Sequence, residues 1–142
     1  MKKQITSAFS LIELTLAIGI AALCLLAVIG LVPVAVLTTR NATSQTAATS
    51  VMASVIADMR ATTGSTSPQY GITDRTPKTL YFDDTGQFTT SLGANSRYRV
   101  SVTFPSSPSG LSYADIKATW PAAATPSNAS GSAEMFAAFK RN

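Results

Sequence analysis

The pattern of hydrophobic and polar residues in this chain changes near residue 37. Residues 14–37 contain no charged side chain, and Glu13 stands directly before this apolar run. As a helix rising about 1.5 Å per residue, the run would be about 36 Å long, which is enough to cross about 30 Å of hydrocarbon. We therefore predict a membrane-spanning helix over residues 9–37.

The next segment has the periodicity of an amphipathic helix. After the threonine-rich residues 38–46, apolar residues recur at helical spacing. These residues are Ala48, Val51, Met52, Val55, Ile56 and Met59. The pattern predicts that the first helix continues over residues 38–63 with one face covered. We expect it to end near residues 60–63, with Gly64 as its stop and residues 65–68 as a loop.

The remainder, residues 64–142, alternates between apolar and polar positions as β-strands do. The predicted strands are residues 79–82, 87–90, 97–104, 113–120 and 134–140. One face of the third and fourth strands is apolar, with Tyr98, Val100, Val102 and Phe104, then Ala114, Ile116, Ala118 and Trp120. Residues 83–86, Asp-Asp-Thr-Gly, suit a hairpin turn, and Pro121 ends the fourth strand. We predict an α+β fold in which a long N-terminal helix packs on a small antiparallel sheet.

The length and charge of the chain limit its domain organisation and its possible partners. The 142 residues have room for one membrane segment and one small domain. Lys2 and Lys3 precede the apolar run, and this bias predicts a cytoplasmic N-terminus and an extracytoplasmic C-terminal part. The remaining positive charge is scattered, so we predict no nucleic-acid partner. The only cysteine, Cys24, lies in the apolar run, which excludes an intrachain disulfide.

The first residues carry a recognisable signal. A short basic leader, residues 1–8, ends in the small residue Ala8 and is followed by Phe9-Ser10-Leu11-Ile12-Glu13 and the apolar run. This arrangement resembles the prepilin-type signal of type IV pilins and type II secretion pseudopilins. The resemblance implies a pilin-like fold, cleavage between Ala8 and Phe9 by a prepilin peptidase, and N-methylation of Phe9. Ala8 departs from the glycine that is usual before the cut.

The same resemblance gives Glu13 a role. In the family, this carboxylate neutralises the new amino group of a neighbouring subunit, and the pair selects one axial register during assembly. The alternative is that Glu13 extends to the membrane surface beside Lys3. Pro33 is a helix breaker of the kind that family members often carry in this half of the run.

A second resemblance covers three separate segments. Residues 8–26, 46–62 and 117–121 resemble pilin-like proteins called Verru/Chthon cassette protein B. That family has no biochemical role to carry over to this chain.

Enzymatic chemistry has little support in the sequence. Asp84-Thr85-Gly86 resembles the aspartic-protease triplet, but that chemistry needs two carboxylates and only one copy is present. Asp83 and Asp84 leave a calcium loop open as an alternative to a plain turn. The chain has no histidine. We predict no enzyme activity, no cofactor and no metal site.

The prediction for function is a pilin-like structural subunit, either a minor pilin or a pseudopilin. Its predicted partners are a prepilin peptidase, other pilin-like subunits that contact the N-terminal helix, and the bacterial inner membrane. The alternative is a single-pass, membrane-anchored extracytoplasmic binding domain that never polymerises.

Overall fold

The computed structural model describes residues 10–73, 76–105 and 111–140, which form one helix and five strands. The α+β class predicted from the sequence is confirmed. The chain divides into two compact units, with the boundary between Arg40 and Asn41. The apolar run lies in the first unit, and all five strands lie in the second.

Helix α1 covers Leu11–Ala61 and includes Pro33 without ending there. All six residues of the predicted apolar stripe in its second half are buried. The helix ends at Ala61, within the predicted range of residues 60–63, although Gly64 does not have the positive φ angle of a glycine stop. The Thr62 hydroxyl donates a hydrogen bond of 2.7 Å to the Asp58 carbonyl, so a side chain satisfies a carbonyl in the last turn.

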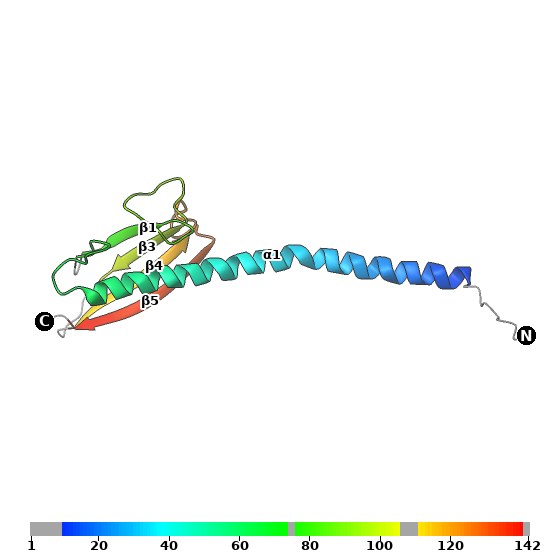
Figure 1. The fold of residues 1–142 in the computed structure, drawn as a ribbon, viewed down its shortest axis with the longest axis horizontal. Coiled ribbons are helices and arrows are strands. Elements are labelled where there is room, and N and C mark those ends of the chain that lie inside the picture. Colours follow the sequence, from blue (N-terminus) through cyan, green and yellow to red (C-terminus); the bar gives the residue numbers. More distant parts are fainter. Residues whose placement is uncertain (1–9, 74–75, 106–110, 141–142) are drawn as a thin grey trace, which may run out of the picture. The chain divides into compact units, whose positions relative to one another are not determined.

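The five strands form one antiparallel sheet in the order β2-β1-β3-β4-β5 (Figure 1). The strands are β1 (Lys78–Phe82), β2 (Phe88–Thr89), β3 (Tyr98–Thr103), β4 (Leu111–Trp120) and β5 (Gly131–Lys140). The last strand therefore begins three residues before the predicted start at residue 134. Strand β5 begins at Gly131 because that residue pairs with Trp120, and the Ser130 amide donates to the Trp120 carbonyl at 2.9 Å.

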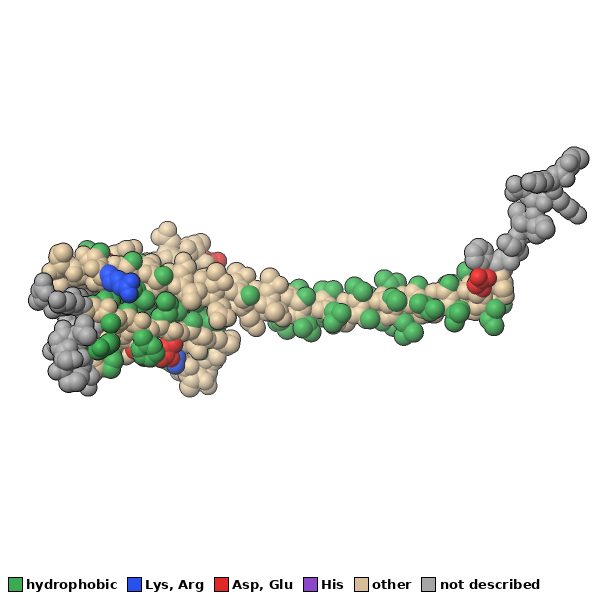
Figure 2. All heavy atoms as spheres, turned by 90° about the horizontal axis from the view of Figure 1, so that it is seen from below, with side chains coloured by type: hydrophobic (Ala, Val, Ile, Leu, Met, Phe, Trp, Pro, Cys, Tyr) green, Lys and Arg blue, Asp and Glu red, His purple; other side chains and the backbone are tan. Residues whose placement is uncertain are grey.

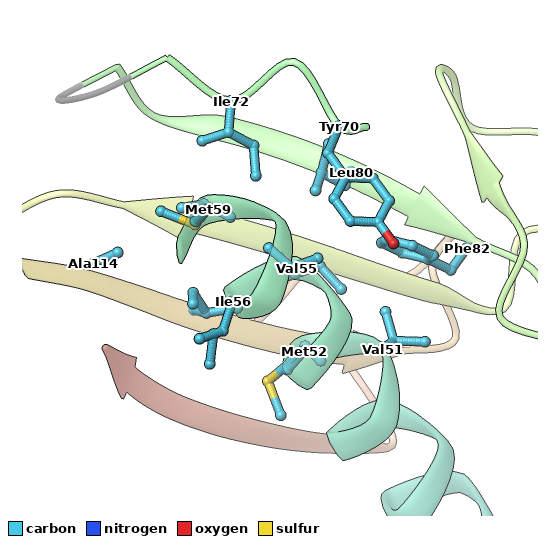
Figure 3. Close-up of a cluster of buried hydrophobic side chains, with 14 of the residues drawn as sticks. Val51, Met52, Val55, Ile56, Met59, Tyr70, Ile72, Leu80, Phe82 and Ala114 are labelled. Carbon is cyan, nitrogen blue, oxygen red and sulfur yellow. The ribbon is translucent and has the colours of Figure 1, made fainter. Parts of the chain in front are cut away.

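The core of the second unit lies between the buried stripe of α1 and one face of the sheet (Figure 3). The predicted alternation is confirmed, since Val100, Val102, Ile116 and Ala118 are all fully buried. Each strand therefore places every second side chain in the core and leaves the others on the opposite face of the sheet.

Aromatic rings close the core beside the first hairpin. Tyr70 packs edge-on against Phe82 and Phe88, with ring centroids 5.6 and 5.3 Å away. Phe82 and Phe88 are also paired in register across β1 and β2. The predicted hairpin over residues 79–90 is thus formed, and it packs under the loop that follows α1.

Candidate functional site

Of the three predicted site residues, Glu13 lies at the start of α1. The Ser10 carbonyl accepts hydrogen bonds from the amides of Glu13, at 3.0 Å, and Leu14, at 3.1 Å. Glu13 thus lies in the first helical turn, where a negative charge interacts favourably with the helix dipole. Ala8 and Phe9, the predicted cleavage and methylation positions, lie outside the described residues.

The surface of α1 in the first unit is almost entirely apolar. The large aliphatic side chains of residues 11–37 range from 45% exposed at Val36 to 83% exposed at Leu11. Figure 2 shows hydrophobic side chains along this stretch of helix. By length and composition, α1 is the one helix in the described residues that could cross a membrane. Apolar surface is unfavourable in water by about 25 cal/mol per Å², so covering this surface would lower the free energy.

Threonine side chains after Pro33 form hydrogen bonds to the helix backbone. The hydroxyl groups of Thr38 and Thr39 donate to the carbonyls of Val34 and Ala35, each at 2.9 Å. Thr46 repeats the arrangement with the carbonyl of residue 42. These bonds satisfy the hydroxyl groups within the helix, where threonine has only moderate propensity.

The Asp-Asp-Thr-Gly segment is a turn held by Asp83. Its Oδ1 accepts hydrogen bonds from the Thr85 hydroxyl at 2.7 Å, the Gln87 amide at 2.8 Å and the Thr85 amide at 2.9 Å. The Thr85 hydroxyl, followed by the Gln87 amide, lowers the pKa of the Asp83 carboxyl. Gly86 has a φ angle of 82°, a conformation that favours glycine. These features account for the segment as a hairpin turn, while Asp84 is exposed beside it.

No described cluster has the makeup of a metal site. Within residues 10–73, 76–105 and 111–140, no three His, Cys, Asp or Glu residues gather where they could hold an ion. Cys24, in the first unit, is a free thiol on the exposed surface of α1.

Asp58 is a buried carboxylate that the sequence analysis did not single out. It is only 7% exposed, and its two oxygens accept hydrogen bonds from the amides of Gln69 and Tyr70, both at 3.1 Å. The carboxylate thereby fastens the loop after α1 to the last turns of the helix. The sequence did contain a clue to its burial, because Asp58 follows Val55 by three residues and so lies beside the apolar stripe of the helix.

A second polar group lies on the sheet face opposite α1. Burial, and then the neighbouring Glu134, raise the pKa of the Asp115 carboxyl, while Lys117 opposes the shift. Lys117 and Glu134 form an ion pair with an N–O distance of 3.7 Å. On the same face, Asp115 Oδ1, Arg99 Nε and Thr119 Oγ1 are buried without a hydrogen-bond partner among the described residues.

Comparison with protein-family models, curated proteins and solved structures finds no match to this chain. Function must then be inferred from the chain itself. The features that bear on it are the N-terminal motif, the exposed apolar helix that follows this motif, and the two faces of the sheet.

Proposed function

We propose that this chain is a pilin-like structural subunit, a minor pilin or pseudopilin of a type IV pilus or a type II secretion-like filament. The observation that carries the proposal is the order of features at the N-terminus. A basic leader ends at Ala8, Phe9-Ser10-Leu11-Ile12-Glu13 follows, and an uncharged apolar helix comes next. A prepilin peptidase is the proposed processing enzyme.

The exposed apolar surface of α1 supports this role. A helix that is apolar all round requires an apolar environment on every side. In the proposed life cycle, lipid of the bacterial inner membrane supplies that environment first, and the corresponding helices of other subunits supply it after assembly. The second unit then lies on the extracytoplasmic side.

Glu13 supplies the specificity of the proposed assembly. Two apolar helices can pack in several axial registers with similar free energy, because each register buries a similar area of apolar surface. An amino group at Phe9 of one subunit beside Glu13 of another would make one register preferable. Removing one partner of a buried ion pair typically costs about 3–5 kcal/mol, so a wrong register would be strongly penalised.

The test is to coexpress the chain with a prepilin peptidase and determine the mature N-terminus. We expect loss of residues 1–8, a methylated Phe9, and a fall in formal side-chain charge from +4 to +2 as Lys2 and Lys3 leave. Intact-mass analysis with N-terminal sequencing measures all three.

Ala8→Gly is the control that restores the residue usual in the family. Efficient cleavage of Ala8→Gly alone would identify a poor natural site. Full-length chain from both versions would contradict the proposal and favour the alternative, a membrane-anchored extracytoplasmic binding domain that does not polymerise.

A further inference from the structure

Strand β5 forms a long and regular edge of the sheet. It is last in the strand order, and its ten residues pair with β4 in one unbroken register, from Leu111–Lys140 to Trp120–Gly131. In the described part of the chain, no other strand pairs with its second edge. The amide and carbonyl groups on that side are therefore open to another strand.

The two edges of the sheet differ in how they are protected. At the opposite edge, β2 has only two residues, which is too short to template another strand. Strand β5 has no proline and no bulge, and its charged residues are Glu134 and Lys140, the latter at its very end. The charge of Glu134 is paired with Lys117 on β4. The central part of β5 thus lacks the proline, the bulge and the unpaired charges that usually prevent edge-to-edge association.

We infer that β5 pairs antiparallel with β5 of a second copy of this chain, about a two-fold axis at Phe136. This register keeps core-facing residues on one face and the others on the opposite face, as continuation of the sheet requires. On the core side, Met135 then lies opposite the partner copy's residue 137, an alanine, and Ala133 lies opposite residue 139, a phenylalanine. Each pair joins a large side chain to a small one, so the strand is complementary to itself in volume.

The opposite face supports the same register. Phe136 is 73% exposed although it lies at the middle of a strand, and the axis brings it directly against its counterpart. Aromatic side chains directly opposite each other across two antiparallel strands stabilise the pairing. Glu134 would lie opposite Ala138, so the two glutamates do not face each other. Tyr113, which is 40% exposed on β4 and registered with Ala138, extends the apolar surface beside the axis.

Cysteine crosslinking of the purified full chain tests this pairing in a Cys24→Ala background. Residues directly opposite in an antiparallel pair have Cα atoms about 4.5–5.5 Å apart, within disulfide reach. Phe136→Cys should therefore give a disulfide-linked dimer on mild oxidation. Ser132→Cys is the matched control on the same face, since its counterpart would be about 26 Å away at about 3.3 Å per residue.

A second arm leaves Phe136 unchanged. Equal amounts of Glu134→Cys and Ala138→Cys chains should crosslink to each other when mixed, whereas each alone should not. Adding Phe136→Lys to both places like charges on the axis and should lower the yield several-fold. The fluorescence of Trp120, the only tryptophan, checks that each variant keeps its fold.

Dimers from Phe136→Cys and from the mixed pair, with little from Ser132→Cys, would support the inference. Equal yields at Ser132 and Phe136, or no dimer in the mixed pair, would overturn it. The inference does not depend on N-terminal processing, because the crosslinked strand lies in the second unit and the test uses the chain with or without its leader.

Discussion

At the scale of single residues, Gly131 is the most constrained glycine in the described structure. A Cβ atom at this position would lie 2.4 Å from Cε2 and Cζ2 of Trp120 and 2.7 Å from its Nε1. Real carbon atoms do not approach a ring so closely, and the ring is held in the core beside Tyr98, with centroids 6.1 Å apart. The small residue at the start of β5 is therefore required by the tryptophan that it pairs with.

Gly131→Ala should accordingly destabilise the second unit by about 1–3 kcal/mol, the usual cost of overpacking. Chemical denaturation followed by the fluorescence of Trp120 measures this loss. Gly64→Ala is the control, because a Cβ there meets no atom within 4 Å, and its effect should stay within about 0.5 kcal/mol. Equal stability of the two variants would show that Trp120 moves aside freely.

Asp115 gives stability a dependence on pH with a defined sign. Folding raises the pKa of its carboxyl, chiefly through burial, so the folded state binds this proton more tightly than the unfolded state does. Its contribution to stability is complete below the ordinary aspartate pKa of about 3.9 and is lost as pH rises through the raised value. Asp115→Asn should therefore gain stability relative to the natural chain as pH increases.

Urea denaturation across that pH range, followed by Trp120 fluorescence, measures the difference. Asp83→Asn is a control of opposite sign, because hydrogen bonds lower the pKa of the Asp83 carboxyl. The contribution of Asp83 to stability is present above the ordinary aspartate pKa and is lost as pH falls through the lowered pKa. A constant difference between Asp115→Asn and the natural chain would contradict the assigned sign.

At the scale of elements, α1 serves two environments with one continuous helix. Its first part exposes aliphatic side chains on all sides, whereas its second part buries a single stripe against the sheet. The helical backbone allows this change because its hydrogen bonds are internal and do not depend on which side chains surround it. The functional difference lies entirely in the side chains.

Glu13→Gln tests the proposed role of the first part of α1. Loss of a first-turn acid should cost the helix only about 0.3–1 kcal/mol, whereas an unpaired buried amine at Phe9 of a neighbour would cost about 3–5 kcal/mol. Leader cleavage and the second unit should therefore be unaffected, and filament incorporation should fall sharply. Crosslinking of Ser10→Cys chains to Leu14→Cys chains, in a Cys24→Ala background, would report the intersubunit contact.

Undiminished crosslinking and incorporation of Glu13→Gln would mean that the charge pair does not select the register. Glu13→Asp is the matched control, because it keeps the charge and the first-turn position and should retain most of the assembly.

At the scale of the whole molecule, the second unit contains its own core. The buried residues of α1 that pack on the sheet all follow Arg40, and the strands, with Tyr70 and Ile72 of the loop after α1, supply the rest. A chain beginning at Thr38 should therefore fold without the apolar run, as a cooperative mixed helix and sheet.

Thermal unfolding followed by circular dichroism and Trp120 fluorescence tests this expectation. Val102→Asp should abolish the transition, since Val102 is fully buried and an unpaired charge there costs more than about 4 kcal/mol. Thr79→Asp, at an exposed position of the neighbouring strand β1 and opposite Ser101, should retain it. Absence of cooperative unfolding in the unsubstituted segment would contradict the expectation of an independent domain.

The sequence by itself determined the elements, because each element follows a local physical rule. The uncharged run of residues 14–37, the apolar stripe from Ala48 to Met59 and the alternation around Val100 and Ile116 each record which side of a helix or strand is buried. The predicted site residues Ala8, Phe9 and Glu13 also came from sequence alone, because the prepilin-type signal is a contiguous stretch of residues and does not depend on tertiary contacts.

Only the tertiary structure decided how the strands are ordered and which polar groups meet. Strand β5 is an edge strand because it pairs only with β4 in the strand order. The alternation of residues 131–140 shows which side chains share a face, but it does not show which strands lie beside them. Asp58 meets the amides of Gln69 and Tyr70, and the partly buried Asp115 lies near Glu134, through contacts between residues far apart along the chain. Such pairings depend on the packing of the entire core, so the physical reason for them lies outside any single segment.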